Sequence, residues 1–293
     1  MIILDGKKTA QIIRHELREQ ISQLTQQGIR PPGLAVILCG KDPASQIYVR
    51  NKANACVDVG IRAESFHLPE NVQESELVQL IHTLNEREDI DGILLQLPLP
   101  SHLHPAVSLL SINPRKDVDG FHPENAGRLA LGLPCLKPCT PQGIMELLRH
   151  YDLSCEGKKA VVVGRSNIVG KPLSLLLAEP LEYANATVTI CHSRTQDLAR
   201  ECREADFLFL AIGSPHLIDQ NYVKKGACVV DIGITRTPTG IQGDADFEAL
   251  KPIVSAITPV PGGIGPMTVT MLLKNTVLAW KTQLHLADFF SNQ

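Results

Sequence analysis

The sequence predicts an α/β protein with two lobes, each built around a parallel β-sheet. Short apolar runs typical of buried strands alternate with segments of helical periodicity. This alternation occurs twice, before and after a segment at 111–143 that is rich in Pro, Gly and Asn. The strands are apolar almost throughout, which is typical of parallel sheets that helices cover on both faces.

The first block contains three predicted strands and three predicted helices. Residues 9–27 carry apolar side chains at helical spacing and are followed by Gly28, a common residue at helix ends. The order is then strand, helix, strand, helix, strand, over residues 33–40, 46–58, 61–69, 74–87 and 92–100. Strands joined by helices in this way are expected to lie parallel.

Residues 111–143 contain no long periodic run and are expected to connect the two lobes. In the second block, strands are predicted at 158–164, 186–193, 207–213, 227–234 and 255–263, and helices at 171–179 and 197–205. The last helix, 267–283, is apolar almost all round, so it must be buried and is expected to pack back on the first lobe. We therefore predict one domain of residues 1–140, completed by a C-terminal helix at 268–293, and a second of residues 141–267.

Composition and charge exclude several kinds of partner. The net charge is −3, aromatic residues make up 4% and no basic run occurs, so no nucleic-acid partner is expected. Charged residues occur within the first few positions, which is not typical of a signal peptide, and no apolar run of about 20 residues is present that could span a membrane. We therefore expect a cytoplasmic protein with no membrane partner. The eight cysteines include no Cys-x-x-Cys pair, which predicts reduced, mostly buried thiols and no metal site.

The segment VVVGRSNIVGKP (161–172) is a candidate dinucleotide loop in a Rossmann-like second lobe. Gly164 stands at the turn after the strand, and Gly170 stands where helix and strand would touch. Ser166 occupies the position of the usual second glycine, so the segment departs from the common fingerprint. An ordinary strand-to-helix turn is the alternative interpretation.

The end of the following strand indicates which dinucleotide would bind. NAD enzymes usually carry an acidic residue there for the ribose hydroxyls. This sequence instead has ICHSRT (190–195), in which Ser193 and Arg194 favour the 2′-phosphate of NADP. Arg165 in the candidate loop adds a second cation, and solvated surface arginines are the alternative.

Tyr48 and Lys52 lie four residues apart, so a helix places both side chains on one face. The same Tyr-x-x-x-Lys spacing occurs in short-chain dehydrogenases, where the pair follows the dinucleotide loop in the same domain. Here the pair precedes the candidate dinucleotide loop and lies in the other lobe. This order in the sequence excludes a short-chain dehydrogenase. A half-exposed helix face without a catalytic role is the structural alternative.

Five motifs together identify a resemblance that covers residues 1–280. They are YVRNK (48–52), LLQLPLP (94–100), KDVDGF (116–121), VVVGRSNIVGKP (161–172) and ITPVPGGIGPMT (257–268). In this order they closely resemble the bifunctional methylenetetrahydrofolate dehydrogenase/methenyltetrahydrofolate cyclohydrolase family. The resemblance implies NADP-dependent oxidation of 5,10-methylenetetrahydrofolate and hydrolysis of the product to 10-formyltetrahydrofolate. It also implies a folate-binding first lobe that faces the nucleotide lobe across a cleft, and a homodimer formed through the nucleotide lobes.

The resemblance assigns roles to four side chains of the first lobe. Lys52 is expected to be central to the hydrolytic step, with Gln96 hydrogen-bonded beside it and Tyr48 orienting the folate. Asp119 is expected to accept hydrogen bonds from pterin N–H groups, because a carboxylate suits a two-donor edge. Asp117 is the competing candidate for that role.

Further residues are expected to line the two binding sites. Leu97 is assigned to the folate site and Ile234 to the cofactor site, and Pro261, Gly262 and Gly263 to a backbone wall near both folate and nicotinamide. The two glycines would permit close approach of the chain, and a plain turn is the alternative.

Electrostatics constrain the state of the catalytic lysine. An ammonium about 4 Å from the methenyl cation would cost about 4 kcal/mol at an effective dielectric constant of about 20. Lys52 is therefore expected to be neutral, or nearly so, when that cation is bound. The competing functions are a monofunctional dehydrogenase, a non-catalytic NADP-binding sensor, and an enzyme that uses NAD with Mg²⁺ and phosphate.

Overall fold

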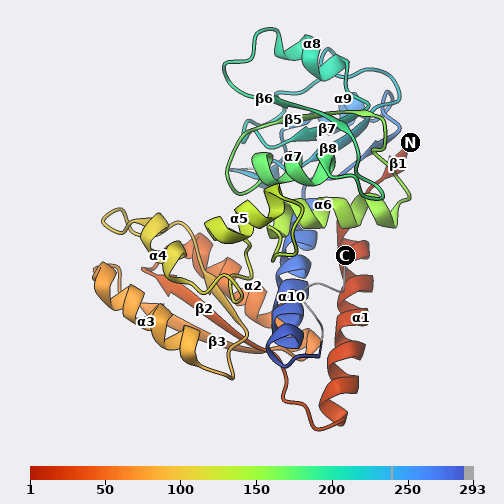
Figure 1. Ribbon diagram of the computed structural model, residues 1–293. Coiled ribbons are helices and arrows are strands. Elements are labelled where there is room, and N and C mark those ends of the chain that lie inside the picture. Colours follow the sequence, from red (N-terminus) through yellow and green to blue (C-terminus); the bar gives the residue numbers. More distant parts are fainter. Residues whose placement is uncertain (239, 287–293) are drawn as a thin grey trace. The chain divides into compact units, whose positions relative to one another are not determined.

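The structure is a computed structural model that describes residues 1–238 and 240–286 (Figure 1). It divides into two compact units: Met1–Gln11 with Thr140–Thr268, and Ile12–Cys139 with Val269–Gln293. We call them the six-stranded unit and the three-stranded unit after their main sheets. The predicted α/β class with parallel sheets is confirmed, and each unit is described separately.

The three-stranded unit has a fully parallel sheet in the order β3-β2-β4. Its strands are β2 (Gly33–Cys39), β3 (Arg62–Leu68) and β4 (Gly92–Leu95). The central strand β2 is buried along its whole length, as its unbroken apolar sequence predicts. Its helices are α1 (Gly6–Gln26), which starts in the other unit, α2 (Pro43–Val59), α3 (Glu74–Glu86), α4 (Pro105–Ser111), α5 (Pro123–Ala130) and most of α10 (Ile264–Gln283).

Local signals fix the helix that carries the Tyr/Lys pair. The Asp42 side chain accepts a hydrogen bond from the Ser45 backbone N–H at 2.7 Å, and Pro43 occupies the first helical turn, so α2 begins there. Gly60, with φ of 90°, ends the helix in the left-handed conformation. The helix thus starts three residues before the predicted start at 46, which leaves Tyr48 and Lys52 well inside it.

The six-stranded unit contains a parallel sheet in the order β1-β11-β8-β7-β5-β6. Its strands are β1 (Ile2–Ile3), β5 (Lys159–Val163), β6 (Thr187–Cys191), β7 (Phe207–Leu210), β8 (Cys228–Asp231) and β11 (Ala256–Ile257). The chain moves outward in opposite directions from β5 and β7, which makes their junction a topological switch point. In such sheets ligands bind at the carboxyl ends of the strands beside this point.

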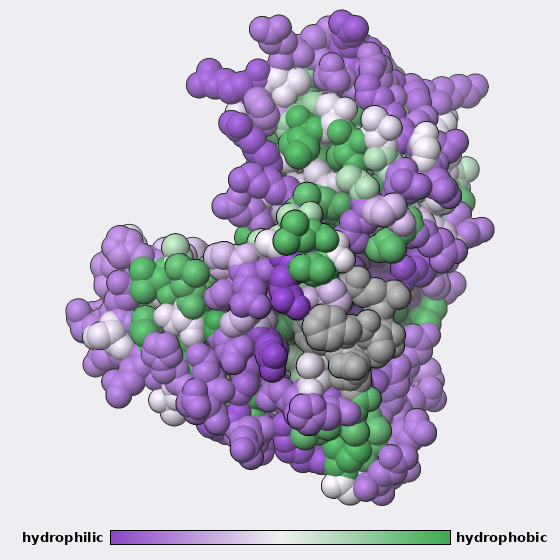
Figure 2. Space-filling view, in the orientation of Figure 1, coloured by the Kyte–Doolittle hydropathy of each residue, from purple (hydrophilic) through white to green (hydrophobic). Residues whose placement is uncertain are grey.

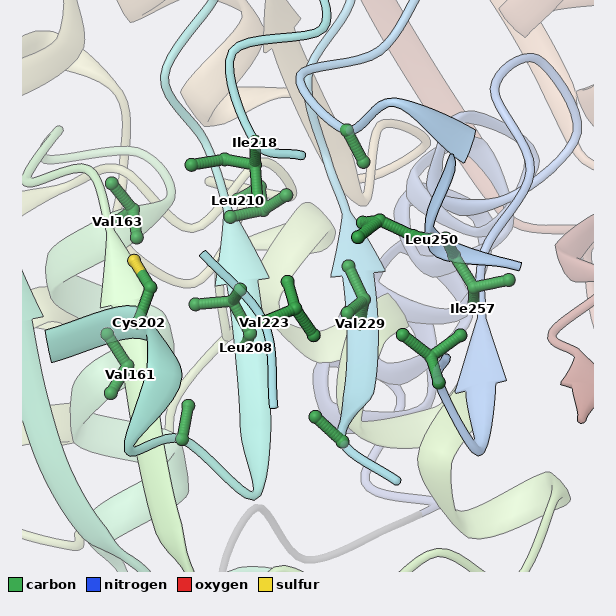
Figure 3. Packing of buried hydrophobic residues seen from close by; sticks show 14 of the residues in the cluster. Val161, Val163, Cys202, Leu208, Leu210, Ile218, Val223, Val229, Leu250 and Ile257 are labelled. Atoms are coloured by element: carbon green, nitrogen blue, oxygen red, sulfur yellow. The ribbon is translucent and has the colours of Figure 1, made fainter. Parts of the chain in front are cut away.

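Helices and an apolar cluster complete the six-stranded unit. The helices are α6 (Cys139–His150), α7 (Gly170–Ala178), α8 (Leu198–Arg203) and α9 (Phe247–Leu250), and a separate hairpin joins β9 (Thr235–Thr237) to β10 (Gly240–Gln242). Figure 3 shows one face of the sheet, where Val161, Leu208 and Val229 from neighbouring strands form a layer with side chains from α8 and α9. This packing fixes the strands whose ends carry the candidate cofactor residues.

The structure differs from the predicted boundaries in several places. Residues 1–11 lie in the six-stranded unit rather than the first domain, because β1 pairs in parallel with β11. The connection at 111–143 contains α5 and the start of α6, whose few turns are too short to show a periodic pattern. The strand predicted at 92–100 ends at Leu95. The strand predicted at 207–213 ends at Leu210, the one at 227–234 ends at Asp231, and the one at 255–263 comprises only Ala256–Ile257. Residues 287–293 of the predicted C-terminal helix lie outside the described residues.

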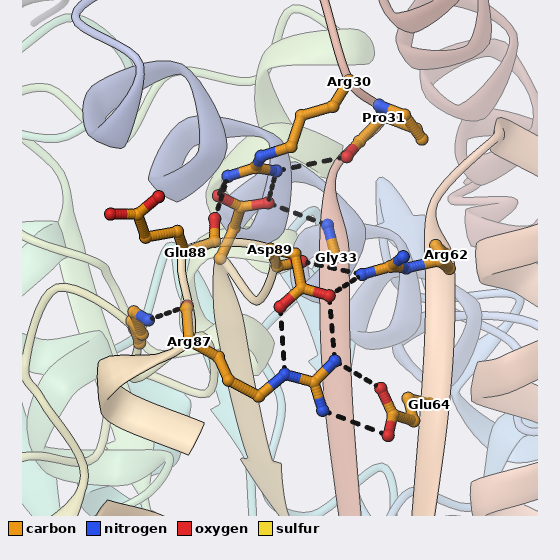
Figure 4. A network of polar contacts seen from close by, with 10 residues as sticks. Arg30, Pro31, Gly33, Arg62, Glu64, Arg87, Glu88 and Asp89 are labelled. Atoms are coloured by element: carbon orange, nitrogen blue, oxygen red, sulfur yellow. Dashed lines mark hydrogen bonds and ion pairs between the residues drawn. The ribbon is translucent and has the colours of Figure 1, made fainter. Parts of the chain in front are cut away.

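A network of charged side chains lies where the strands of the three-stranded sheet begin (Figure 4). The Arg30 guanidinium donates to both carboxylate oxygens of Asp91, at 2.7 and 2.8 Å, and Asp91 also accepts from the Gly33 N–H at 2.8 Å. Asp89 pairs with Arg62 and Arg87 nearby. The Asp91 side chain is fully buried, whereas the Asp89 and Arg62 side chains are 41% and 54% exposed. Among these ion pairs, Asp91 is therefore the one carboxylate that is fully shielded from water.

Two further expectations concern cysteines and membrane spans. All eight cysteines are free and buried, which confirms the prediction of buried thiols. Among the described residues, no helix combines the length and the apolar character that a membrane span needs.

Candidate active site

Lys52 and Gln96 meet at the edge of the three-stranded sheet where the strands end. The Gln96 N–H donates to the Ile37 carbonyl at 2.9 Å, so β4 keeps the ladder geometry for one residue beyond its last regular position. The Gln96 amide oxygen accepts from Lys52 Nζ at 3.2 Å, and its Nε2 donates to the Leu97 carbonyl at 2.7 Å. These two bonds fix which way the amide points, with its oxygen toward the lysine. The hydrogen bond expected between Lys52 and Gln96 is thus present.

Tyr48 precedes Lys52 by one helical turn on α2. Its side chain is 38% exposed, and the Lys52 side chain is half-buried. The helix therefore presents a phenol ring and an amine from one face, as the spacing predicts. A ring in this position can contact a flat ligand while the amine reaches its edge.

The two acids of KDVDG have different surroundings. The buried Asp117 carboxylate accepts hydrogen bonds from the His122 N–H at 2.7 Å and from Asn125 Nδ2 at 3.0 Å, so it holds the turn that leads into α5. Among the described side chains, the Asp119 carboxylate has one hydrogen-bonding neighbour, the Cys139 thiol at 4.0 Å. Asp117 is thus engaged by N–H groups of the protein, whereas no N–H group of the described residues donates to the Asp119 carboxylate.

Burial shapes the acidity of Asp119. Removal from water raises the pKa of its carboxyl to about 6, while the Lys52 charge lowers this pKa and the Asp117 charge raises it. The positive charge of Lys52 therefore favours the carboxylate form of Asp119. An acid with this pKa changes its charge close to neutral pH, as is common for groups in ligand sites.

The rest of the KDVDG motif anchors this segment. Lys116 is buried, and its Nζ donates to three carbonyls at the end of α3, those of Leu84, Asn85 and Arg87, at 3.3, 2.7 and 2.8 Å. Burial lowers the pKa of this lysine. Gly120 has φ of 75°, and a side chain there would meet the backbone between residues 137 and 138 at 2.6 Å. No other residue type fits this position without strain.

Two residues that the sequence analysis missed hold the same segment. Asn275 of α10 is buried, and its Nδ2 donates to the carbonyls of Val118 and Lys137 at 2.8 and 2.9 Å. The Cys139 thiol lies 3.2 Å from the Val118 carbonyl. Nothing in the local sequence indicates these contacts, because Asn275 lies 157 residues from Val118. The amide of α10 therefore fixes the backbone immediately before Asp119.

The candidate cofactor loop lies at the switch point of the six-stranded sheet. Gly164 has φ of 135°, and a side chain there would meet the Ala211 carbonyl oxygen at 2.4 Å. A side chain at Gly170 would meet the Gly164 carbonyl oxygen at 2.1 Å. The chain therefore passes close to itself at both glycines, as the sequence predicts for a tight strand-to-helix turn.

The loop leaves several polar groups available to a ligand. The Ser166 hydroxyl accepts from the N–H groups of Val169 and Gly170 at 3.1 and 3.3 Å, so it serves the start of α7. The N–H groups of residues 165–168 have no acceptor within the described parts of the chain. Exposed N–H groups ahead of a helix, with Arg165 beside them, fit a phosphate. The residues present thus suit the pyrophosphate part of a dinucleotide.

The turn after β6 adds a second cation to the same edge of the sheet. β6 lies next to β5, and the Gly164 N–H donates to the Cys191 carbonyl at 2.9 Å. His192 shapes the turn, because its Nδ1 accepts from the Arg194 N–H at 3.1 Å. Ser193 and Arg194 are exposed, and neither arginine, Arg165 or Arg194, forms an ion pair with another described residue. Two unpaired guanidinium groups near one loop suit a phosphate.

Leu97 lies in the three-stranded unit, directly after Gln96, whereas Ile234 and the Pro261–Gly263 segment lie in the six-stranded unit. Ile234 is 49% exposed in the turn after β8. In the segment after β11, Gly262 has φ of 112°, and a side chain at Gly263 would meet the Pro259 carbonyl oxygen at 2.6 Å. Gly6, at the start of α1, is packed against Gly263 so closely that a side chain there would overlap its carbonyl. Close packing at Gly6 and Gly263 and the positive φ of Gly262 therefore account for these glycines within this unit alone.

Comparison with known proteins identifies the family. The model of the tetrahydrofolate dehydrogenase/cyclohydrolase catalytic domain matches residues 4–119, and the model of the NAD(P)-binding domain of the same family matches residues 138–284. The chain belongs to the tetrahydrofolate dehydrogenase/cyclohydrolase family. The resemblance inferred from the five motifs is thereby confirmed.

Individual members of the family are similar over nearly the whole chain. Bifunctional protein FolD of Nitratidesulfovibrio vulgaris is 62% identical and covers 97% of this chain and 99% of its own. The crystal structure of the FolD dehydrogenase/cyclohydrolase from Campylobacter jejuni is 49% identical, with a TM-score of 0.93 and coverage of 96% and 99%. The Trypanosoma brucei FolD structure, complexed with NADP and an inhibitor, is 39% identical, with a TM-score of 0.91 and coverage of 97% and 98%.

Proposed function

We propose that this chain oxidises 5,10-methylenetetrahydrofolate to 5,10-methenyltetrahydrofolate with NADP and hydrolyses the product to 10-formyltetrahydrofolate. Family membership and the bifunctional relatives support both activities. The observation that carries the hydrolytic half is the hydrogen bond from Lys52 Nζ to the Gln96 amide oxygen at 3.2 Å. The presence of Tyr48, Lys52, Gln96 and Asp119 together argues against a monofunctional dehydrogenase.

In the proposed reaction, the folate ring system lies against Tyr48 with its pterin N–H groups donating to Asp119. Lys52 transfers protons as water adds to the methenyl carbon and the ring opens. Gln96 accepts a hydrogen bond from the Lys52 amine and so keeps the amine in place. Repulsion from the methenyl cation favours the neutral amine at this stage.

The first test measures both reactions in the same preparation. We expect NADP to be reduced when 5,10-methylenetetrahydrofolate is added, and added methenyltetrahydrofolate to lose its near-ultraviolet absorbance faster than without enzyme. A parallel assay with NAD, with and without Mg²⁺ and phosphate, checks cofactor choice. Oxidation without accelerated hydrolysis would favour the monofunctional alternative, and NADP binding without either reaction would favour a sensor.

Folate binding should weaken below about pH 6. The carboxylate form of Asp119 accepts the pterin N–H groups, and the pKa of this carboxyl in the free protein is about 6. Below that pH binding must first release a proton, so the Kd of a non-reacting folate analogue should rise about tenfold per pH unit from pH 6 toward pH 4. Calorimetric titration from pH 8 to pH 4 measures this dependence.

The matched variant for this experiment is Asp119→Asn. It should bind the analogue weakly with a Kd that stays flat between pH 8 and pH 5, because no carboxyl remains to titrate at that position. An unaltered pH dependence in the variant would show that another group is responsible.

The dehydrogenase half depends on residues of the six-stranded unit. In the proposal, the turn at Gly164 and the N–H groups of residues 165–168 bind the pyrophosphate, and Arg165, Ser193 and Arg194 bind the 2′-phosphate. Ile234 contacts the cofactor and the Pro261–Gly263 segment lines the nicotinamide site, whereas Leu97 contacts the folate in the three-stranded unit. When bound, the nicotinamide ring accepts the hydride, so the protein contributes chiefly binding and orientation.

Arg194→Ala should change cofactor preference. Loss of one charge-assisted contact to the 2′-phosphate is expected to raise the KM for NADP about 10- to 100-fold. The KM for NAD should stay within about twofold, since NAD lacks that phosphate. Arg203→Ala, an exposed arginine of α8 that donates to the Asn221 carbonyl, is the control and should change neither value. Equal rises in the KM for NADP and the KM for NAD would show that Arg194 does not bind the 2′-phosphate.

Oligomeric state and location complete the proposal. We infer a homodimer formed through the six-stranded unit, whose sheet has β6 at one edge. Exposed apolar side chains gather on and around α7 and β6: Ile168, Leu175, Leu181 and Ile190. In Figure 2 apolar side chains reach the surface among hydrophilic ones on the face that carries β5, β6 and α7. Light scattering of the purified protein tests the dimer.

The eight free thiols fit a reducing, cytoplasmic location.

A further inference from the structure

A buried carboxylate holds the loop that follows β7. Asp244 Oδ2 accepts from the N–H groups of Ile212 and Gly213 at 2.6 and 3.1 Å, and Oδ1 accepts from the Ser214 N–H at 2.8 Å. The Asp244 side chain has no solvent exposure. Three consecutive backbone donors therefore converge on one side chain, which fixes the path of the chain as it leaves the sheet.

A second carboxylate holds the turn that follows β8. Asp231, the last residue of that strand, accepts from the N–H groups of Gly233 and Asp244 at 2.9 and 3.0 Å through Oδ1. Its Oδ2 accepts from the Ala245 N–H at 2.8 Å. The turn that presents Ile234 is thus tied to the same segment that carries Asp244.

Two glycines allow the carboxylates to come this close to the backbone. A side chain at Gly233 would lie 2.3 Å from Cγ of Asp244, and one at Gly243 would lie 2.1 Å from Oδ2 of Asp231. Burial and the nearby charge of Asp244 raise the pKa of the Asp231 carboxyl to about 6. Two buried acids near one another are costly to keep, and six backbone N–H bonds offset this cost.

The position of the pair connects it with the cofactor edge. β7 lies next to β5, so the loop held by Asp244 starts beside the turn at Gly164, whose backbone passes the Ala211 carbonyl. The turn held by Asp231 follows the neighbouring strand β8 and ends at Ile234. Both loops leave the sheet at the carboxyl ends of strands, on the side where parallel sheets bind nucleotides.

We propose that Asp231 and Asp244 are positioning residues for dinucleotide binding. They fix the loops after β7 and β8 in the conformation that the cofactor needs, and touch neither substrate nor reacting atoms. The proposal rests on the NADP-dependent reaction proposed above. Because the pair acts only on cofactor affinity, its loss should weaken the NADP-dependent oxidation and leave the hydrolysis unchanged.

The test is Asp244→Asn, which keeps the size of the side chain but replaces one accepting oxygen with an NH₂ group. That group would face a backbone N–H, so the loop must shift. We expect the KM for NADP to rise about 10- to 100-fold, because small displacements of binding groups have effects of this size. The kcat at saturating NADP and the cyclohydrolase rate, which requires no dinucleotide, should stay within about twofold. Asp231→Asn should behave alike.

Asp206→Asn is the matched control. Asp206 precedes β7 at the opposite end of the strand, where it accepts from the Lys159 N–H at 2.8 Å and pairs with Lys224 at 2.6 Å. Its replacement should leave the KM for NADP unchanged. If Asp244→Asn does not fold, the KM for NADP and the cyclohydrolase rate are measured in Gly233→Ala instead. This variant keeps both carboxylates, and its added methyl group displaces only the carboxylate of Asp244.

Each outcome bears on one proposal. A rise in the KM for NADP with intact cyclohydrolase activity supports the positioning role. An unchanged KM, or equal loss of both activities in a folded variant, overturns it and leaves the pair a structural support only. A wild-type protein that fails to reduce NADP contradicts the proposed function instead.

Discussion

Lys52→Met should lose cyclohydrolase activity by at least about 100-fold while measurable hydride transfer to NADP remains. Methionine is unbranched and only one atom shorter than lysine but cannot carry a proton, and positioned proton transfer contributes about 10²- to 10⁴-fold in enzymes. Oxidation of the methylene group depends on how the two ring systems are held, so it does not require this amine. Separate assays of NADP reduction and methenyltetrahydrofolate hydrolysis give the two rates.

Lys41→Met is the control for this variant. Lys41 is exposed and lies two residues before α2 begins, so its loss should leave both rates within about twofold. Equal loss of oxidation and hydrolysis in a folded Lys52→Met protein would contradict the proposed division of labour. A hydrolysis rate like that of the wild type would remove Lys52 from the mechanism.

Arg30→Met should destabilise the three-stranded unit by about 3 kcal/mol, because it leaves the fully buried Asp91 carboxylate without its cation. The remaining bond from the Gly33 N–H cannot compensate for a buried charge. Trp280, the only tryptophan of the chain, is fully buried in the part of α10 that belongs to this unit. Its fluorescence during urea denaturation therefore reports the unfolding free energy of this unit.

Arg62→Met is the matched control at the same end of the sheet. Arg62 and Asp89 are both substantially exposed, and Asp89 keeps its bond with Arg87, so this change should cost less than about 1 kcal/mol. Similar losses in the two variants would show that burial of Asp91 does not set the strength of the network drawn in Figure 4.

Sequence patterns predicted the elements whose signals are local. Apolar runs marked β2 and β5, helical spacing marked α1, and a segment apolar almost all round marked α10. The pattern failed where an element was short or formed by distant pairing. Helix α5 has eight residues, and β1 exists only because it pairs with β11, more than 250 residues later in the chain.

The candidate site shows the same division. Tyr48 and Lys52 could be placed on one face from spacing alone, and Gly164 from its strand and helix neighbours. The motif KDVDG indicated an acid for a ligand but left Asp117 as a competitor. The hydrogen bonds from His122 and Asn125 to Asp117, absent at Asp119, are what distinguish the two acids.

By itself, the sequence determined the α/β class, the motifs and the residue types at each candidate site, because periodicity and turn chemistry act between near neighbours. Only the tertiary structure decided which groups support them. The contacts of Lys116 with the end of α3, of Asn275 with Val118, and of Asp244 with the loop after β7 join residues about 30 to 157 positions apart. A hydrogen bond depends on atomic distance and angle, which are set when the chain packs.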